Sequence, residues 1–562
     1  MQMTEVKSFI SQYVKGHVSH KLTWLCDVRM HVNKKFMALS LFTPLIGIHT
    51  STSFLCRAVQ TPSQSFKGAM LSENPLDVPE ITGLVASYLE GKDLARCVQV
   101  SKRWRDLFLT YRWRTVKAGS KIDNYSRVSR LGPHPSVLYR HRHLIHKLSL
   151  SGDTTGLDKN HFPNIRTLDL RIQHDAEREV SKKLTKSFPS LVELVLHGPN
   201  FASELWFALA VHPRITDLIM FGGEIKVKAE PLFWKVCRRL NVLDMDGVTF
   251  GNGTIPSGVV FDRMYTLELV RSNLDISSQM DLILRCPNLK NLNWFDYDSL
   301  HHNRNNEHPI LETGCVPEGH WHRLQRLSIQ HHFRDTQMAF ILKGIGDGNL
   351  ATLTLEDCRL DEQGSEALRP HFATLVHLDI DQCRSVNSST IRDVLCSCPR
   401  LEYLHAAGVF ARDVVNGGPW VCQRLQEMRI AFLFRESEQD LQREIFGRLS
   451  TLTRLKRLEM RIPEVESYDG EDILEFRMEN GLEQLATLQQ ITSLEFSEGS
   501  NNGEYFPQLG KDEIVWMVAH WKKLKNLTGE LNYDHDEDSR LKTVLELLGV
   551  NTEAWPYGSF SA

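Results

Sequence analysis

The stretch Phe162-Pro163-Asn164-Ile165-Arg166-Thr167-Leu168-Asp169-Leu170 decides the fold, because close variants of it recur along most of the chain. Leu168 and Leu170 alternate with polar residues, which is the period of a short strand that buries one face. The proline has no amide donor and disfavours helix in the residue before it, so it ends a helix and starts the strand segment. The same proline recurs at Pro189, Pro213, Pro287 and Pro399.

Fifteen leucine or methionine anchors mark these strand segments. Their spacing ranges from 20 to 36 residues and is most often 24 to 26. They are Leu148, Leu168, Leu194, Leu218, Leu243, Leu267, Leu292, Leu327, Leu353, Leu378, Leu404, Met428, Leu458, Leu494 and Leu527. Such a period indicates a stack of equal supersecondary units, and it is similar to that of leucine-rich repeats.

Helical stretches lie between the anchors. Residues 391–396 carry apolar side chains at Ile391, Val394 and Leu395, which lie on one helix face. Parallel strands need such crossovers, and the crossovers are right-handed. The sequence therefore predicts an α/β solenoid over residues 146–535, curved, with parallel strands on the concave side and helices on the convex side.

Size and composition restrict the function classes. The chain has 562 residues, a formal net charge of −3 and 41% hydrophobic residues, which suits a core-forming protein. This charge argues against a nucleic-acid binder that relies on phosphate neutralisation. The 11 cysteines form no CxxC pairs, which favours a reducing compartment, cytoplasmic or nuclear. The apolar run 36–48 is too short to span a membrane, so no membrane span is expected.

The ends of the chain differ from the solenoid. Residues 1–72 show no period, and residues 1–69 hold eight Lys or Arg against two acids. This region is interpreted as a disordered extension or a mispredicted start, with a targeting presequence as the alternative. Residues 119–145 are expected to be a linker, and residues 536–562 a C-terminal cap or tail.

Residues 73–118 predict a compact helical unit. Ile81, Leu84, Val85 and Tyr88 share one face of a first helix. Asp93 and Ser101 are predicted to cap a second and a third helix. Three short helices bury little surface alone, so the unit is expected to need a partner or a neighbour.

The order of residues in this unit resembles an F-box. The matching positions are Pro79-Glu80-Ile81, Val85, Tyr88-Leu89, Asp93-Leu94, Val100 and Trp104. The family's adjacent Leu-Pro pair is here split between Leu76 and Pro79. An unrelated helical cap for the solenoid is the alternative. An F-box followed by leucine-rich repeats is similar to the F-box/leucine-rich-repeat class of substrate receptors.

This resemblance implies a non-catalytic subunit of an SCF-type cullin ubiquitin ligase. The helical unit would dock on a Skp-family adaptor, which binds a cullin, and the solenoid would hold a client protein. The implied adaptor-binding residues are Leu76, Pro79, Ile81, Val85, Leu89, Leu94, Val100 and Trp104. A protein-interaction scaffold outside any ubiquitin ligase is the alternative function.

Client contacts are predicted on the concave face. In each strand segment, the residues one and three positions after the anchor point to this face, as Asp169 and Arg171 do after Leu168. Nine of these are acidic and three basic, so we expect a basic client segment with an apolar anchor. The predicted client-binding residues are Phe221, Asp244, Asp246, Glu268, Phe295, Glu356, Asp379 and Asp381. Solvated acids that only keep the sheet soluble are the alternative.

The long interval between Leu292 and Leu327 predicts a loop insertion at residues 297–321. It is rich in histidine, including His301, His302 and His308, but no ligand pair has the spacing of a zinc finger. No nucleophile, base and acid occur in a known catalytic context. The sequence therefore predicts no catalytic residue, metal site, cofactor or small-molecule substrate, with an enzyme hidden in the insertion as a further alternative.

Overall fold

The structure is a computed structural model of the whole chain. It describes residues 79–119, 135–151, 161–171, 186–201, 203–295, 316–383, 385–461, 472–497, 509–532 and 534–553, together with Ser181 and Leu184. The chain divides into two compact units, one of Met1–Ala118 with Leu131–Ser149 and one of Gly119–Arg130 with Leu150–Ala562. The expected extension 1–72 and Leu76 lie outside the described residues.

The first unit is mainly helical. It contains α4 (Pro79–Ser87), α5 (Gly91–Val100), α6 (Lys102–Arg114), β1 (Thr115–Gly119), α7 (Pro135–His141), the 3₁₀ turn η2 (Arg142–Leu144) and β2 (Lys147–Ser151). The Trp113 ring stacks on His141 with centroids 4.4 Å apart, which ties α6 to α7. Residues 119–145 are thus more than the expected linker, because a helix and a turn form there.

The second unit is a parallel ladder in which the strands follow chain order. They are β3 (Thr167–Arg171), β4 (Glu193–His197), β6 (Asp217–Phe221), β8 (Val242–Asp246), β10 (Thr266–Val270), β11 (Asn291–Phe295), β12 (Arg326–Gln330), β13 (Thr352–Glu356), β15 (His377–Gln382), β17 (Tyr403–Ala406), β19 (Glu427–Ile430), β21 (Arg457–Arg461), β23 (Ser493–Ser497) and β24 (Asn526–Gly529).

The predicted anchors set the register of this ladder. Leu168 lies opposite Leu194, Leu194 opposite Leu218, and the match continues strand by strand to Leu494 opposite Leu527. The 35-residue interval does not disturb it, since Leu292 still lies opposite Leu327. The anchors are buried, and the strand residues that alternate with the buried positions are mostly half-buried, as a sheet with one core face requires.

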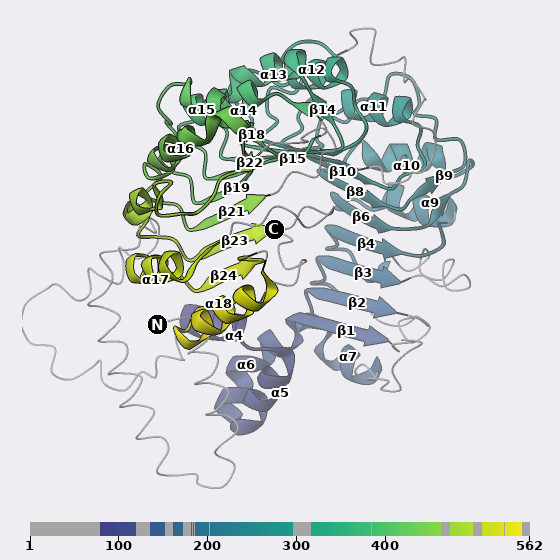
Figure 1. Cartoon of the computed structure of the whole chain (residues 1–562). Helices are drawn as coiled ribbons and strands as arrows, with labels where there is room; N and C mark the ends of the chain where they lie inside the picture. The colour runs from purple at the N-terminus through teal and green to yellow at the C-terminus, as the bar shows by residue number, and fades with distance from the viewer. Residues whose placement is uncertain are drawn as a thin grey trace, which may run out of the picture. The chain divides into compact units, whose positions relative to one another are not determined.

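Helices cover the outer side of the curved ladder (Figure 1). They are α9 (Ser203–Val211), α10 (Glu230–Cys237), α11 (Ile276–Leu284), α12 (Asp335–Lys343), α13 (Glu362–Leu368), α14 (Ser388–Ser397), α15 (Ala411–Val415), α16 (Gln442–Leu449) and α17 (Lys511–His520), with 3₁₀ turns η6 (Arg369–His371), η7 (Glu436–Leu441) and η8 (Leu482–Thr487). Helix α11 ends three residues before Pro287 and α14 two residues before Pro399, as predicted. The predicted α/β solenoid, with strands inside and helices outside, is confirmed.

Short strands form three further small sheets. They are β5 (Asn200–Phe201), β7 (Glu224–Ile225), β9 (Thr249–Phe250), β14 (Arg359–Leu360), β16 (Ser385–Val386), β18 (Val409–Phe410), β20 (Phe432–Phe434) and β22 (Asp472–Ile473). Beyond β24, α18 (His535–Leu547) occupies the expected cap region, and Asn551 forms a parallel bridge to Asn526. Within the parts that the structure describes, no helix is long and apolar enough to cross a membrane.

Candidate functional site

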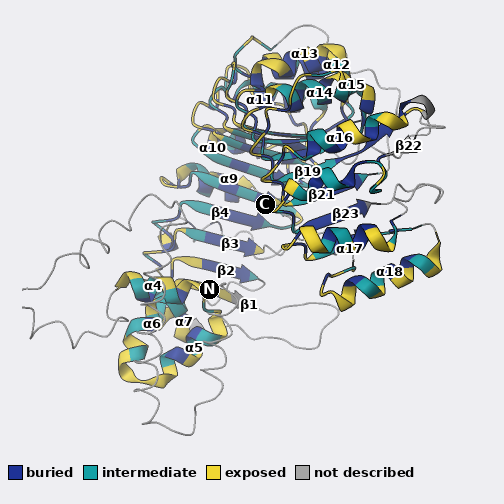
Figure 2. Ribbon diagram, turned by 60° about the vertical axis from the view of Figure 1, so that its left-hand side comes forward, coloured by how far each residue is buried: buried dark blue, intermediate teal, exposed yellow. Residues whose placement is uncertain are grey.

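The three helices of the first unit share a small core. Ala86, Leu94, Cys97 and Phe108 are buried in it. Half-buried apolar side chains pack around them: Val85, Leu89, Val98, Trp104, Leu107 and Tyr111. Few side chains of these helices are fully covered, and their surfaces are mostly half-exposed or exposed (Figure 2). A core of this size makes the unit dependent on other contacts for stability.

Local signals explain where these helices begin. The Ser101 hydroxyl accepts a hydrogen bond from the Trp104 amide at 3.1 Å, so Ser101 caps α6 as predicted. The predicted cap at Asp93 is wrong, because Glu90 is the N-cap residue of α5 and makes no side-chain cap bond. Asp93 lies inside the first turn and forms an ion pair with Arg96 at 3.2 Å.

The structure divides the predicted adaptor-binding residues into three groups. Pro79 and Val100 are exposed, the latter to 50%, and Ile81 is half-buried. Val85, Leu89 and Trp104 pack at the edge of the helical core. Leu94 is only 7% exposed and packs in the core of the three helices, so its predicted contact with an adaptor stays a prediction.

Two exposed apolar side chains extend this surface beyond the predicted set. Leu84 is 59% exposed and Tyr88 is 38% exposed, both at or just after α4. The sequence pattern of α4 predicted a single apolar face, and Leu84 and Tyr88 lie at its outer edge. Their helical spacing was visible in the sequence, but which edge of a short helix is covered depends on its neighbours.

The concave side of the second unit carries two aligned rows of side chains. One row consists of the residues that directly follow the anchors, from Asp169 through Asp244 and Glu268 to Glu495. The next row contains Phe221, Asp246, Val270 and Phe295, in register on the consecutive strands β6, β8, β10 and β11. The predicted client-binding residues therefore do lie on one face of one sheet.

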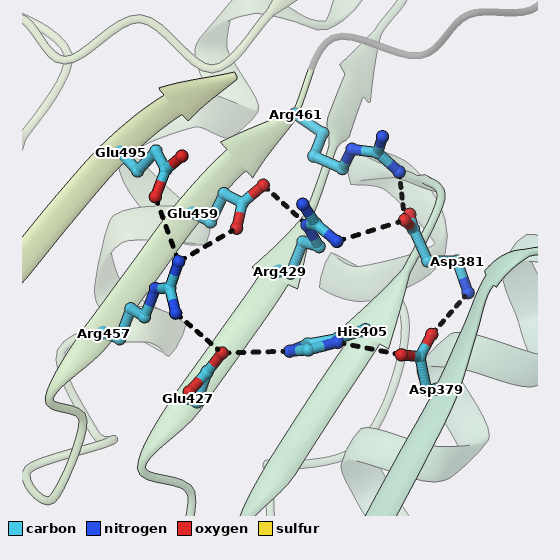
Figure 3. A network of polar contacts seen from close by, with 9 residues as sticks. All are labelled: Asp379, Asp381, His405, Glu427, Arg429, Arg457, Glu459, Arg461 and Glu495. Atoms are coloured by element: carbon cyan, nitrogen blue, oxygen red, sulfur yellow. Dashed lines mark hydrogen bonds and ion pairs between the residues drawn. The ribbon is translucent and has the colours of Figure 1, made fainter. Parts of the chain in front are cut away.

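The C-terminal part of this face holds a network of charges on β15 to β23 (Figure 3). Its carboxylates are Asp379, Asp381, Glu427, Glu459 and Glu495, and its cations are His405, Arg429, Arg457 and Arg461. The Arg429 Nε donates to Glu459 at 2.6 Å, and Arg461 pairs with Asp381 across the sheet. Each of these five acids thus has a cationic partner from the same sheet.

His405 lies at the centre of that network. Its ring nitrogens are 3.1 Å from Asp379 and 3.2 Å from Glu427. Burial disfavours the charged imidazole, but the two carboxylates outweigh it and raise the pKa of His405 to about 9. Burial likewise acts against ionised Asp379 and Glu427, yet their hydrogen bonds to His405 leave both pKa values below the ordinary range.

The N-terminal part of the concave face has a different charge balance. Asp246 accepts a bidentate pair from Arg271, at 2.8 and 2.7 Å. Asp244 and Glu268 lie opposite each other on β8 and β10, and no cation of the described chain forms an ion pair with either. Burial, with help from Glu268 and Asp246, raises the pKa of Asp244 to about 7.

The structure separates the predicted client residues accordingly. Asp244 and Glu268 are half-buried and form no ion pair with the described chain, and Phe221 is 38% exposed and stacks on His197 with ring centroids 4.7 Å apart. Asp381 has only 3% of its side chain exposed and pairs with Arg429 and Arg461. The view of Asp379 and Asp381 as open acids is corrected, because both are held inside the charge network. Glu356 has a raised pKa, caused by burial and by Asp379 and Asp357.

The histidine-rich insertion lies largely outside the described residues, including His301, His302, His308 and Cys315. Of its described part, the His320 ring lies 2.8 Å from the Leu284 carbonyl oxygen and joins the insertion to α11. Among the residues that the structure describes, no three His, Cys, Asp or Glu form a group that could hold a metal ion.

Comparison with known proteins identifies the first unit. Residues 79–117 match the family model described as F-box-like, so the chain carries an F-box-like domain, as the sequence predicted. No curated protein matches the chain in sequence.

Among solved structures, the complex of Rad7 and Elc1 in yeast aligns at 13% identity, covering 73% of this chain and 97% of that one, with a TM-score of 0.37. The TLR13–ssRNA13 complex aligns at 13% identity, covering 74% of this chain and 63% of that one, with a TM-score of 0.35. Likenesses of this extent carry no weight for function.

Proposed function

We propose that this chain is the substrate-recognition subunit of an SCF-type cullin ubiquitin ligase. The F-box-like domain docks on a Skp-family adaptor, and the adaptor binds the cullin. The solenoid holds a client protein. The receptor itself performs no chemistry, because holding a client lysine near a charged ubiquitin-conjugating enzyme raises its effective concentration.

The observation that carries this proposal is the exposed apolar surface of a domain with a small core. Leu84 on α4, Tyr88 just after α4 and Val100 at the end of α5 are large apolar side chains exposed to water. Exposed apolar groups on a small domain favour a partner surface. Pro79 and Ile81 at the start of α4 adjoin them in sequence, and we infer that the adaptor covers this set.

The reducing compartment is part of the same proposal. All eight cysteines in the described residues are free thiols, and seven are buried. Burial raises the pKa of Cys358 to about 12, so its thiol stays protonated and unreactive. Free buried thiols support a cytoplasmic or nuclear location.

Co-expression with the adaptor tests the proposal. The full chain should purify with the Skp-family adaptor in equal amounts, and the double substitution Leu84→Ser and Val100→Ser should weaken the complex at least tenfold, because buried apolar anchors dominate such interfaces. The matched control is Leu547→Ser with Leu548→Ser, which alters two exposed leucines at the C-terminal end of α18. Equal recovery of the adaptor by both variants would refute the docking surface.

A further inference from the structure

The two parts of the concave face differ in whether their acidic side chains have cationic partners. On β15 to β23, five carboxylates meet three arginines and a protonated histidine. On β8 and β10, Asp244 and Glu268 lie side by side with no ion pair to the described chain. Like charges on directly opposite residues of neighbouring strands oppose folding, so the second arrangement is unfavourable in the isolated protein. The carboxylates on β15 to β23 have cationic partners within the sheet, whereas in the described chain Asp244 and Glu268 do not. The pair Asp244 and Glu268 is therefore suited to bind an external cation.

Apolar groups lie in the same two rows as these acids. Ile219 precedes Asp244 in its row and is half-buried. Phe221 and Phe295 flank Asp246 and Val270 in the adjoining row, and Phe221 is exposed. The two rows hold residues two positions apart on each strand, which are about 6.6 Å apart along it, so one extended segment can contact both rows.

A buried acceptor completes the surface. Gln330 follows Phe295 in the second row and is only 8% exposed. Its side-chain oxygen is buried and has no hydrogen-bond partner. A buried acceptor without a donor is unfavourable, and a donor from a bound partner would remove that cost.

We propose that the concave surface formed by Ile219, Phe221, Asp244, Glu268, Phe295 and Gln330 binds an extended, basic protein segment with an apolar side chain. The lysine or arginine lies between Asp244 and Glu268, and the apolar side chain packs on Phe221 or Phe295. An amide or a basic group donates to Gln330. The charge network on β15 to β23 takes no part, because its acids already have partners. The inference rests on the proposed function only in naming this segment a client.

Charge complementarity selects this occupant. An acidic segment would add negative charge to Asp244 and Glu268, and a nucleic acid would add its phosphates. A purely apolar segment would leave both carboxylates desolvated without a partner. A cation beside them removes their mutual repulsion, and the exposed ring supplies apolar contact.

Fluorescence anisotropy with synthetic peptides tests the proposal on the full chain bound to its adaptor. The first peptide has alternating lysine and serine around one central phenylalanine. The second replaces every lysine by glutamate, and the third replaces the phenylalanine by alanine. We expect the first to bind at least tenfold more tightly than the second and at least threefold more tightly than the third, with affinity falling as salt rises.

Matched variants locate the site. Asp244→Asn with Glu268→Gln should weaken binding of the first peptide at least tenfold. Glu362→Gln with Glu366→Gln removes the same charge from exposed positions of α13 and should change binding less than twofold. Equal effects of the two variants, or equal binding of the lysine and glutamate peptides, would overturn the proposal.

The same samples separate this inference from the proposed function. Loss of the adaptor with peptide binding retained would refute the ligase role and leave the concave site standing. If the adaptor still binds but the affinity for the lysine peptide does not change in the Asp244→Asn, Glu268→Gln variant, the site is refuted and the ligase role still stands.

Discussion

At the scale of single residues, Asp244 is a group whose charge opposes folding. Its folded pKa is about 7, above the ordinary 3.8, so between these values the unfolded chain releases a proton that the folded chain keeps. Raising the pH through this range therefore destabilises the fold. We expect Asp244→Asn to stabilise the solenoid by about 1 kcal/mol at pH 8, after allowance for solvent screening, and by little near pH 4. Urea denaturation at both pH values measures this.

The control for Asp244→Asn is Glu362→Gln, at an exposed position of α13, which should leave stability unchanged at either pH. A loss of stability in Asp244→Asn at pH 8 would show that the carboxylate makes a favourable contact in the free protein. It would also remove the physical reason for an external cation at this position.

His405 has the opposite effect on stability. Its folded pKa of about 9 exceeds the ordinary 6.5, so its contribution is complete below about pH 6.5 and is lost as the pH rises through 9. His405→Leu leaves Asp379 and Glu427 without their shared cation, and we expect a loss of about 2 kcal/mol at pH 6. The loss should shrink markedly at pH 10. His535→Leu, on an exposed histidine of α18, is the control; equal losses at pH 6 and 10 would contradict the assignment.

At the scale of elements, the first turn of α6 depends on one hydroxyl. Ser101 accepts from the Trp104 amide, and Trp104 contacts Phe108 with ring centroids 5.3 Å apart. We expect Ser101→Ala to destabilise the F-box-like domain by about 1 kcal/mol and to speed amide exchange in α6. Thr110→Ala, at an exposed position inside α6, should not do so. Unchanged exchange in Ser101→Ala would show that the cap is dispensable.

The same domain shows how far a sequence pattern determines an element. The periodicity predicted three helices, and the cap at Ser101 is where the residue type requires it. Which apolar side chains become core could not be predicted, because Leu94 and Val100 share a helix and have similar chemistry. Leu94 faces α6 and Val100 does not. That difference depends on the angle between two helices, which no local pattern encodes.

At the scale of the whole molecule, the repeat period was sufficient to predict strand order and register. A leucine that recurs about every 24 to 26 residues can be buried in few strand arrangements, and shifting the strand register by one residue would expose it. The charge balance of the concave face could not be obtained in this way. Asp381 and Arg461 are 80 residues apart, and their pairing depends on how far a side chain reaches over the intervening strands.

That contact has a consequence for how the solenoid opens. In a linear stack each repeat normally touches only its neighbours, so the ends can fray one repeat at a time. Arg461 on β21 reaches Asp381 on β15 over β17 and β19, where the row carries the small Ala407 and Ala431. We therefore expect these four strands to separate together. Hydrogen-exchange mass spectrometry should find β15 to β21 exchanging as one cooperative block, and Arg461→Met should split that block into strands that exchange independently.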